Sequence, residues 1–228
     1  MSDSTIHNVR EHLRLGNDAY DSTIRRFIPG YDEMLKAAAG AVAAIDPSLV
    51  QDLGAGTGAL SEALLDQLET GTVELLDVDP EMLEQALQRL KRFGKRVRFT
   101  LRSYDEPFSS CDAFTASLSL HHIATIEMKS ALFARVFDAL HHGGVFVNAD
   151  VSMPTERDEQ NRQYQHWAEH MMKNGITEDR AWQYFEEWSE EDTYLPIEEE
   201  LGALRNMGFE AECVWTEGPV NVLVAKKT

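Results

Sequence analysis

A glycine-rich loop between an apolar run and a helical pattern constrains this chain more than any other feature; it lies in residues 49–69, LVQDLGAGTGALSEALLDQLE. The apolar run reaches an acid, Asp52, and three glycines follow at alternate positions, Gly54, Gly56 and Gly58. A strand, a glycine loop and a helix in this order place backbone N–H groups and a helix N-terminus beside a ligand. Glycines also remove the side chains that would keep the ligand away from the backbone. The stretch therefore predicts a ligand-binding turn in an α/β fold.

Two classes of ligand use this geometry. Dinucleotide-binding folds carry the spacing G-x-G-x-x-G/A, and Gly54, Gly56 and Ala59 meet it. The loop alone therefore leaves NAD open, and the motifs around it have to decide.

Strand-like and helix-like segments alternate through most of the chain, which is typical of a parallel sheet with helices on both faces. The expected strands are 48–53, 72–77, 96–101, 112–120 and 143–151, and the expected helices between them are 59–69, 80–93 and 126–140. A further helix at 197–209 and two strands within 210–227 complete the pattern. Pro80 suits the first turn of its helix, and Asp79 before it is expected to act only as the N-cap.

Two segments stand outside this alternation within what we expect to be a single domain, residues 1–228. Residues 1–45 are expected to form an N-terminal helical cap, and residues 154–194 an inserted helical lid. The lid segment is polar but holds three of the four tryptophans. Because an exposed surface with so many aromatic side chains would favour aggregation, we expect them to cover a substrate pocket. The predicted pocket residues are Tyr20, Trp167 and Trp182, with Tyr31 closing the pocket from the N-terminal side.

The charge balance disfavours a nucleic-acid partner. The sequence has 21 Lys and Arg against 39 Asp and Glu, a formal net charge of −18, whereas binding to phosphate backbones usually needs a basic surface. The basic stretch 89–99 is more simply a helix end and a turn at Gly94. No apolar run reaches the length of a membrane span, and the N-terminus has no apolar signal region. We therefore expect a cytoplasmic protein, with Cys111 and Cys213 as reduced thiols, and a homodimer remains open.

The order of motifs resembles the class I S-adenosylmethionine (SAM) methyltransferases. Asp52 with the three glycines is similar to the first motif of that family, and LLDVDPEML at 75–83 is similar to the second. The resemblance implies a Rossmann-like seven-stranded, mostly parallel sheet with the last strand antiparallel, and SAM as the cofactor. It also implies that Asp77 accepts both ribose hydroxyls, as a carboxylate can. The implied cofactor-binding residues are Tyr31, Asp52, Gly54, Ala55, Gly56, Gly58, Asp77, Val78, Ser103, Tyr104 and Ser117.

Two parts of that site follow the family less closely. The family often has an acid after the third strand to bond the adenine amino group, and this slot falls here at Ser103 and Tyr104, with Asp105 two residues late. Asp52 is expected to reach the methionine amino group directly or through water.

The edges of the chain resemble the branch that contains carboxy-SAM synthase and its ordinary methyltransferase relatives. In that branch a tyrosine after Pro-Gly reaches the cofactor, and Tyr31 in RRFIPGYDEML matches it. The arginine that binds the extra carboxylate in that branch is replaced here by Ala203, with Arg205 nearby on a different helical face. The missing arginine favours plain SAM and a methyl transfer to a small-molecule acceptor. A carboxy-SAM-type or tRNA-modifying enzyme, and a SAM-binding protein without catalysis, remain the alternatives.

Histidines supply the candidate catalytic groups. His121 and His122 follow the fourth strand, at the edge of the sheet where ligands bind, so one of them could act as a base while the other packs. Asn148 and Asp150 close the fifth strand and could also reach the pocket. No metal is expected, although His166 and His170 have an i, i+4 spacing, because no Glu-x-x-His motif or cysteine cluster accompanies them. Methyl transfer needs a base only for some acceptors, so the sequence leaves open whether O, N, S or C is methylated.

Overall fold

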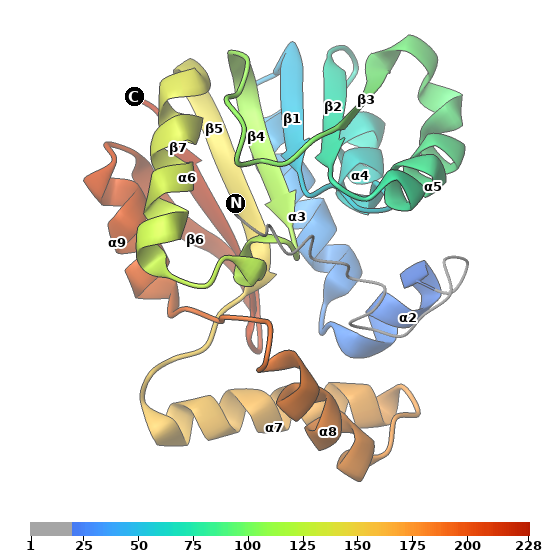
Figure 1. Ribbon diagram of the computed structural model, residues 1–228, viewed down its shortest axis with the longest axis vertical. Coiled ribbons are helices and arrows are strands. Elements are labelled where there is room, and N and C mark those ends of the chain that lie inside the picture. Colours follow the sequence, from blue (N-terminus) through green and yellow to red (C-terminus); the bar gives the residue numbers. More distant parts are fainter. Residues whose placement is uncertain (1–19) are drawn as a thin grey trace, which may run out of the picture.

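A seven-stranded sheet forms the centre of the molecule in a computed structural model, which describes residues 20–228, with side chains from residue 23 onward. The order across the sheet is β3-β2-β1-β4-β5-β7-β6. The first five strands pair in parallel, and β7 runs antiparallel to both of its neighbours. This confirms the predicted Rossmann-like fold with an antiparallel last strand (Figure 1). The strands are β1 (Leu49–Leu53), β2 (Thr72–Asp77), β3 (Val97–Leu101), β4 (Cys111–Ser117), β5 (Leu140–Val151), β6 (Glu210–Glu217) and β7 (Val220–Lys226).

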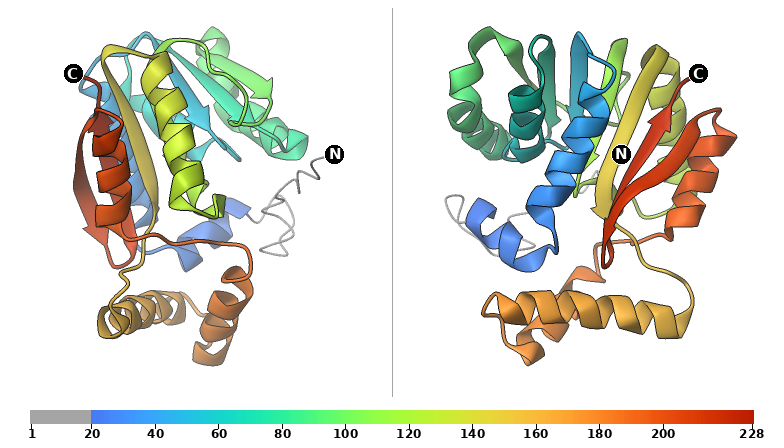
Figure 2. Two further views of the ribbon diagram at one scale, coloured as in Figure 1. Left: turned by 60° about the vertical axis from the view of Figure 1, so that its left-hand side comes forward. Right: turned by 180° about the vertical axis from the view of Figure 1, so that it is seen from behind.

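Helices cover both faces of the sheet. On one face α3 (Tyr31–Ala43), α4 (Ala59–Gln67) and α5 (Pro80–Leu90) share one buried apolar cluster with the sheet. On the other face α6 (Ile126–Ala139) and α9 (Ile197–Asn206) share a second cluster. Alternate residues of the strands supply the two clusters, as the period of a strand requires. The two faces are seen from opposite sides in Figure 1 and in the right-hand view of Figure 2.

A third group of helices lies beyond the carboxyl ends of the parallel strands. It consists of α2 (Tyr20–Phe27), α7 (Arg157–Lys173) and α8 (Glu178–Trp188), and the last two form the lower layer in Figure 1. Trp167 on α7 is buried and its Nε1 donates to the carbonyl of Phe27 on α2, at 2.6 Å. Rings from α7 and α8 pack around it at 5.0–6.5 Å between centroids, and Phe27 of α2 packs on Trp188. The aromatic core of α2, α7 and α8 is continuous with the apolar cluster of α3 and the sheet.

Within the described part of the expected cap 1–45, α3 packs on the sheet through Ala38, Ala39 and Val42, whose small side chains allow close approach, and the cap itself stays a prediction. One predicted boundary differs from the structure. The fifth strand begins at Leu140, not at Gly143, because Gly143 and Gly144 already exchange backbone hydrogen bonds with Lys227.

The two short 3-10 segments are η2 (Lys91–Arg96) and η3 (Leu120–His122). None of the helices among the described residues combines the length and the apolar character needed to cross a bilayer.

Candidate functional site

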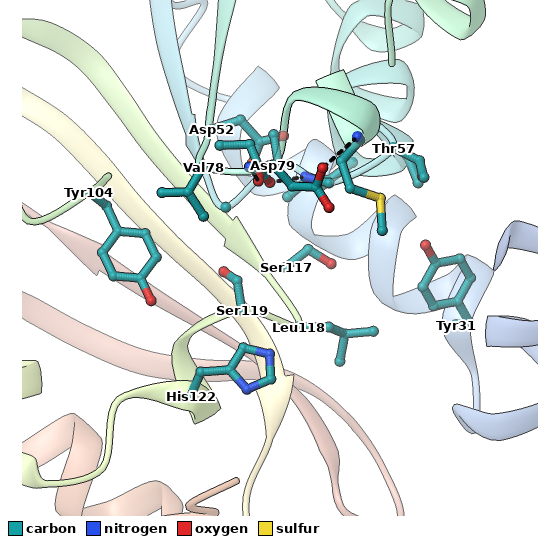
Figure 3. Close-up of a pocket in the computed structure, with 17 residues that line it drawn as sticks. Tyr31, Asp52, Thr57, Val78, Asp79, Tyr104, Ser117, Leu118, Ser119 and His122 are labelled. Carbon is teal, nitrogen blue, oxygen red and sulfur yellow. Dashed lines mark hydrogen bonds between the residues drawn. The ribbon is translucent and has the colours of Figure 1, made fainter. Parts of the chain in front are cut away.

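A cavity opens at the carboxyl ends of β1, β2 and β4, where the order of the strands reverses and α/β folds bind their ligands. Figure 3 shows Tyr31 and Tyr104 on opposite sides of it, with His122 on the side away from Thr57 and Asp79. The lining residues are Tyr31, Asp52, Gly54, Ala55, Gly56, Thr57, Ala59, Leu60, Asp77, Val78, Asp79, Met82, Tyr104, Ser117, Leu118, Ser119 and His122. Nine of the eleven predicted cofactor residues are among them, and Gly58 and Ser103 are not.

Glycine is required at positions 56 and 58 of the loop for different physical reasons. Gly56 has φ +54°, and a Cβ built on it would meet no protein atom within 4 Å, so a side chain there would enter the cavity. Gly58 has φ +78°, and its Cβ would lie 3.1–3.2 Å from Leu90, Ala86 and Leu75. Gly56 therefore keeps space for a ligand, whereas Gly58 allows α4 to pack closely against α5 and β2. The contact of Gly58 with the cofactor stays a prediction.

Asp77, at the end of β2, is held in place by two backbone amides. Its Oδ2 accepts from Gly56 N at 2.7 Å and its Oδ1 from Asp79 N at 2.8 Å. Burial raises the pKa of this carboxyl, and the backbone bonds partly offset the effect. Asp79 itself caps α5, as predicted, by accepting from Glu81 N and Met82 N. A carboxylate fixed beside an open glycine loop is placed to accept hydroxyl donors from a ligand.

Asp52 is more deeply buried than a ligand-facing acid needs to be. It is 1% exposed, and its oxygens accept from Ser61 Oγ at 2.6 Å and Thr115 Oγ1 at 2.8 Å. Burial raises its pKa to about 6, although the two hydroxyl bonds lower it. The side chain therefore joins β1, β4 and α4 as well as lining the cavity, which limits a direct contact with a ligand amino group.

Tyr104, not Ser103, reaches the cavity after β3. Ser103 Oγ bonds to the Asp105 side chain at 3.2 Å and accepts from its amide, so its hydroxyl is used within the loop. Burial, with the charges of Asp105, Asp150 and Asp77, raises the pKa of Tyr104 to about 12, so it can donate a hydrogen bond at neutral pH. Val78 is 38% exposed and offers an apolar surface beside it.

His122 lines the cavity and His121 packs behind it, which separates the two predicted catalytic candidates. The centroids of the two imidazole rings lie 4.2 Å apart. His121 Nδ1 is 2.5 Å from Asp150 Oδ1, whose carboxylate also accepts from three backbone amides, those of residues 120, 121 and 151. Burial lowers the pKa of His121, but the charge of Asp150 and its hydrogen bond outweigh burial and raise it.

Asp192 joins the histidines to the segment that follows α8, and sequence reasoning missed it. Its Oδ1 is 2.9 Å from His122 Nδ1 and 3.9 Å from His121 Nε2, and its Oδ2 accepts from Tyr194 OH at 2.7 Å. Burial raises the pKa of Asp192, but the hydrogen bond from His122 and the charges of both histidines lower it far below its usual range. Thr193 N donates to His121 O at 2.8 Å, so residues 192–194 are fixed to η3.

The structure places neither predicted tryptophan among the lining residues. Trp167 is 1% exposed inside the aromatic core of α2, α7 and α8, and Trp182 is 38% exposed with its ring against Tyr164 and Phe185. The cause is the amphipathic spacing of α7 and α8, which turns their apolar faces toward each other. The side chain of Tyr20 lies outside the described residues.

The remaining polar candidates are used in other contacts. Asn148 Nδ2 donates to Glu200, which also pairs with Lys129 at 2.5 Å, and neither Asn148 nor Asp150 lines the cavity. His166 Nε2 lies 3.2 Å from Glu217, and His170 Nε2 bonds to Arg25 O, so this pair does not converge on one point.

Ala203 lies on α9 in the opposite cluster and does not line the cavity. Among residues 20–228 as described, an arginine at that position would therefore not face the glycine loop of its own chain. The position consequently does not by itself separate plain SAM from carboxy-SAM.

Several lining residues had little signal in the sequence. Thr57, Leu60, Met82 and Ser119 are ordinary residue types that enter the cavity only because of the elements that carry them. Leu118 adopts φ +49°, which is uncommon for a residue with a side chain and typical of functional sites.

Comparison with known proteins points to one family. Residues 51–146 match the family described as "Methyltransferase domain". The carboxy-S-adenosyl-L-methionine synthase of Campylobacter curvus is 32% identical over 132 residues, which is 56% of each chain. The chain thus spans about half the length of the curated relatives it matches.

Solved structures share the fold. An O-methyltransferase family protein from Burkholderia thailandensis aligns with a TM-score of 0.70 and 17% identity, over 97% of this chain and 61% of that one. Human N-acetylserotonin methyltransferase in complex with SAM aligns with a TM-score of 0.59 and 17% identity, over 97% and 62%. Residues 51–146 are thus similar to a methyltransferase domain, and the chain shares the fold of these solved methyltransferases.

Proposed function

We propose that the protein transfers the methyl group of SAM to a small-molecule acceptor bound beside His122. One observation carries this proposal: the Gly56–Asp77 pair and His122 line a single cavity, in which His122 lies on the side away from Thr57 and Asp79 (Figure 3). The open space at Gly56 and the fixed carboxylate of Asp77 fit the adenosyl part of the cofactor. SAM supplies an electrophilic methyl group whose sulfur leaves as a neutral thioether.

The chain's own residues then have a limited task. They hold the two reactants in line and exclude water, which can contribute about 7–11 kcal/mol to lowering the barrier. Asp192 holds the His122 ring at 2.9 Å, so His122 is the polar group best placed to contact the acceptor. His121 is committed to Asp150 and acts by positioning.

The net charge of the chain supports a small-molecule acceptor. A net charge of −18 disfavours a phosphate backbone as substrate. The cytoplasmic location, a homodimer, and the role of residues 154–194 as a lid stay predictions from the sequence.

The test is a methyl-transfer screen over metabolite pools with isotope-labelled SAM. We expect a labelled small molecule from the wild-type chain and none from Gly56→Val. A protein that binds SAM but labels nothing in any pool would contradict catalysis and support the binding-protein alternative.

The carboxy-SAM alternative keeps one observation in its favour, the 32% identity to a carboxy-SAM synthase. Mass spectrometry of the ligand carried through purification distinguishes the carboxy-SAM alternative from the proposed use of plain SAM. Plain SAM or S-adenosylhomocysteine supports the proposal, and carboxy-SAM contradicts it.

A further inference from the structure

Three side chains that carry metal-ligand atoms converge directly behind the cavity. His121, His122 and Asp192 each offer one ligand atom, and these atoms lie within 4.8 Å of one another. Among the described residues this is the one group of three or more His, Cys, Asp or Glu side chains found with that convergence. We propose that these three residues bind a divalent transition metal ion of the zinc class.

The distances suit a tetrahedral ion. Zinc binds histidine nitrogen and carboxylate oxygen at about 2.0–2.1 Å, so neighbouring ligand atoms are about 3.3 Å apart. Asp192 Oδ1 is 2.9 Å from His122 Nδ1 and 3.9 Å from His121 Nε2, so the two separations lie on either side of that value. All three ligand atoms lie within 4.8 Å of one another, so an ion could contact them after side-chain adjustment.

The side chains that would orient the metal ligands through hydrogen bonds are already in place. A carboxylate at neutral pH can only accept, so the proton between His121 Nδ1 and Asp150 belongs to the imidazole, and Nε2 is the nitrogen left to bind a metal. A histidine ligand that donates its other N–H to a carboxylate is the usual arrangement in zinc sites. Tyr194 holds the second oxygen of Asp192 in the same way. The site thus has both ligands and the groups that orient them.

Two buried carboxylates lie at this point. The side chains of Asp150 and Asp192 are 2% and 3% exposed, and each carboxylate contacts a histidine ring. A divalent ion held by Asp192 and the two histidines would place positive charge directly beside both carboxylates.

The site connects distant parts of the fold. Its histidines lie on η3 after β4, and Asp192 follows α8, 70 residues further along the chain. A metal ion there would fix the segment after the lid helices to the edge of the sheet. Three protein ligands leave one tetrahedral position for water or for an acceptor atom, next to the His122 ring that lines the cavity.

Zinc titration of the chelator-treated full chain, by calorimetry and by competition with a chromophoric chelator, tests the proposal. We expect binding of a single ion, with tight binding lost in Asp192→Asn and His122→Gln. Asp150→Asn, which removes an outer partner, should weaken binding by about 10–100-fold. The matched control is His166→Gln with His170→Gln, a second pair of histidines close in sequence, which should leave the affinity for zinc unchanged.

X-ray absorption of the zinc-loaded wild type keeps the proposal falsifiable if a variant does not fold. A shell of nitrogen and oxygen with imidazole scattering supports it, and a sulfur shell from Cys111 or Cys213 overturns it. Binding that is absent in the wild type, or equal in Asp192→Asn, also overturns it. SAM titration of the chelator-treated protein runs in parallel: SAM binding without zinc binding rejects the metal site and leaves the proposed function standing.

Discussion

The two sides of the cavity are built in different ways. The cofactor side uses backbone geometry from a short continuous stretch, in which Gly56 N donates to Asp77 only 21 residues away. The His122 side uses side chains from three separate regions, η3, the end of β5 and the segment after α8, brought together over 29 and 70 residues. A backbone-built site requires glycine and acid at fixed spacing and therefore marks the sequence, whereas a side-chain cluster leaves no local pattern.

The largest effect is expected where a side chain would fill the cofactor side. Gly56→Val should abolish measurable binding of SAM and S-adenosylhomocysteine, because a Cβ at Gly56 points into the open space of the cavity. The φ of +54° strains any side chain at this position, so the stability of the variant is measured beside its binding. Gly94→Val is the matched control: Gly94 has φ +57° and no atom within 4 Å of its Cβ, but it lies outside the cavity. Calorimetry measures SAM binding by both variants, and circular dichroism measures whether they are folded. Equal binding in the two variants would mean that Gly56 does not face the cofactor.

Substitutions of Trp167 on α7 and Trp182 on α8 distinguish a role in packing from a contact with the substrate. Trp167→Ala should lower the free energy of unfolding by about 3–5 kcal/mol, since the ring is buried and its Nε1 is bonded. Trp182→Ala should lower it less, by about 1–3 kcal/mol, since the ring is 38% exposed but still packs against Tyr164 and Phe185. Urea unfolding measures both. A large loss of kcat/KM in Trp182→Ala at normal stability would instead extend the acceptor side to the outer face of α8.

Asp77→Ala tests the one side chain on which the cofactor side depends. Each hydrogen bond to a charged group contributes about 1.5–3 kcal/mol, so losing the carboxylate that accepts both ribose hydroxyls should weaken SAM binding by at least roughly 10–100-fold. Asp79→Ala is the contrast, because this cap should cost about 0.5–2 kcal/mol of stability and less affinity. Unchanged SAM affinity in Asp77→Ala would remove Asp77 from the ribose site.

A pH dependence of stability is expected from Asp52, and it appears only between about pH 4 and 6. Burial raises its pKa from 3.8 to about 6 in the folded chain, so the folded state binds this proton more tightly than the unfolded state. Wild-type stability should therefore fall as pH rises through about 4 to 6, by at most about 3 kcal/mol from this group. Asp52→Asn should flatten that part of the profile in urea unfolding at several pH values. Parallel profiles for the two proteins would show that Asp52 ionises normally.

The same contrast explains what the sequence could predict. The sheet, the cofactor loop, Asp77 and the Asp79 cap follow from local spacing and appear in the structure as expected. The roles of Asp192, Tyr194 and Leu118 depend on how η3 meets the segment after α8, which no local pattern encodes. Trp167 and Trp182 were assigned to the pocket by composition, and only the packing of α7 on α8 shows that one is core and the other faces outward.

Calorimetric titration of the wild-type chain with SAM, S-adenosylhomocysteine and NAD tests the central claim most directly. The glycine spacing alone is compatible with a dinucleotide, so the claim rests on the cavity formed by Gly56, Asp77 and the end of β4. We expect SAM and S-adenosylhomocysteine to bind and NAD to give no heat of binding. NAD binding tighter than SAM would contradict the account.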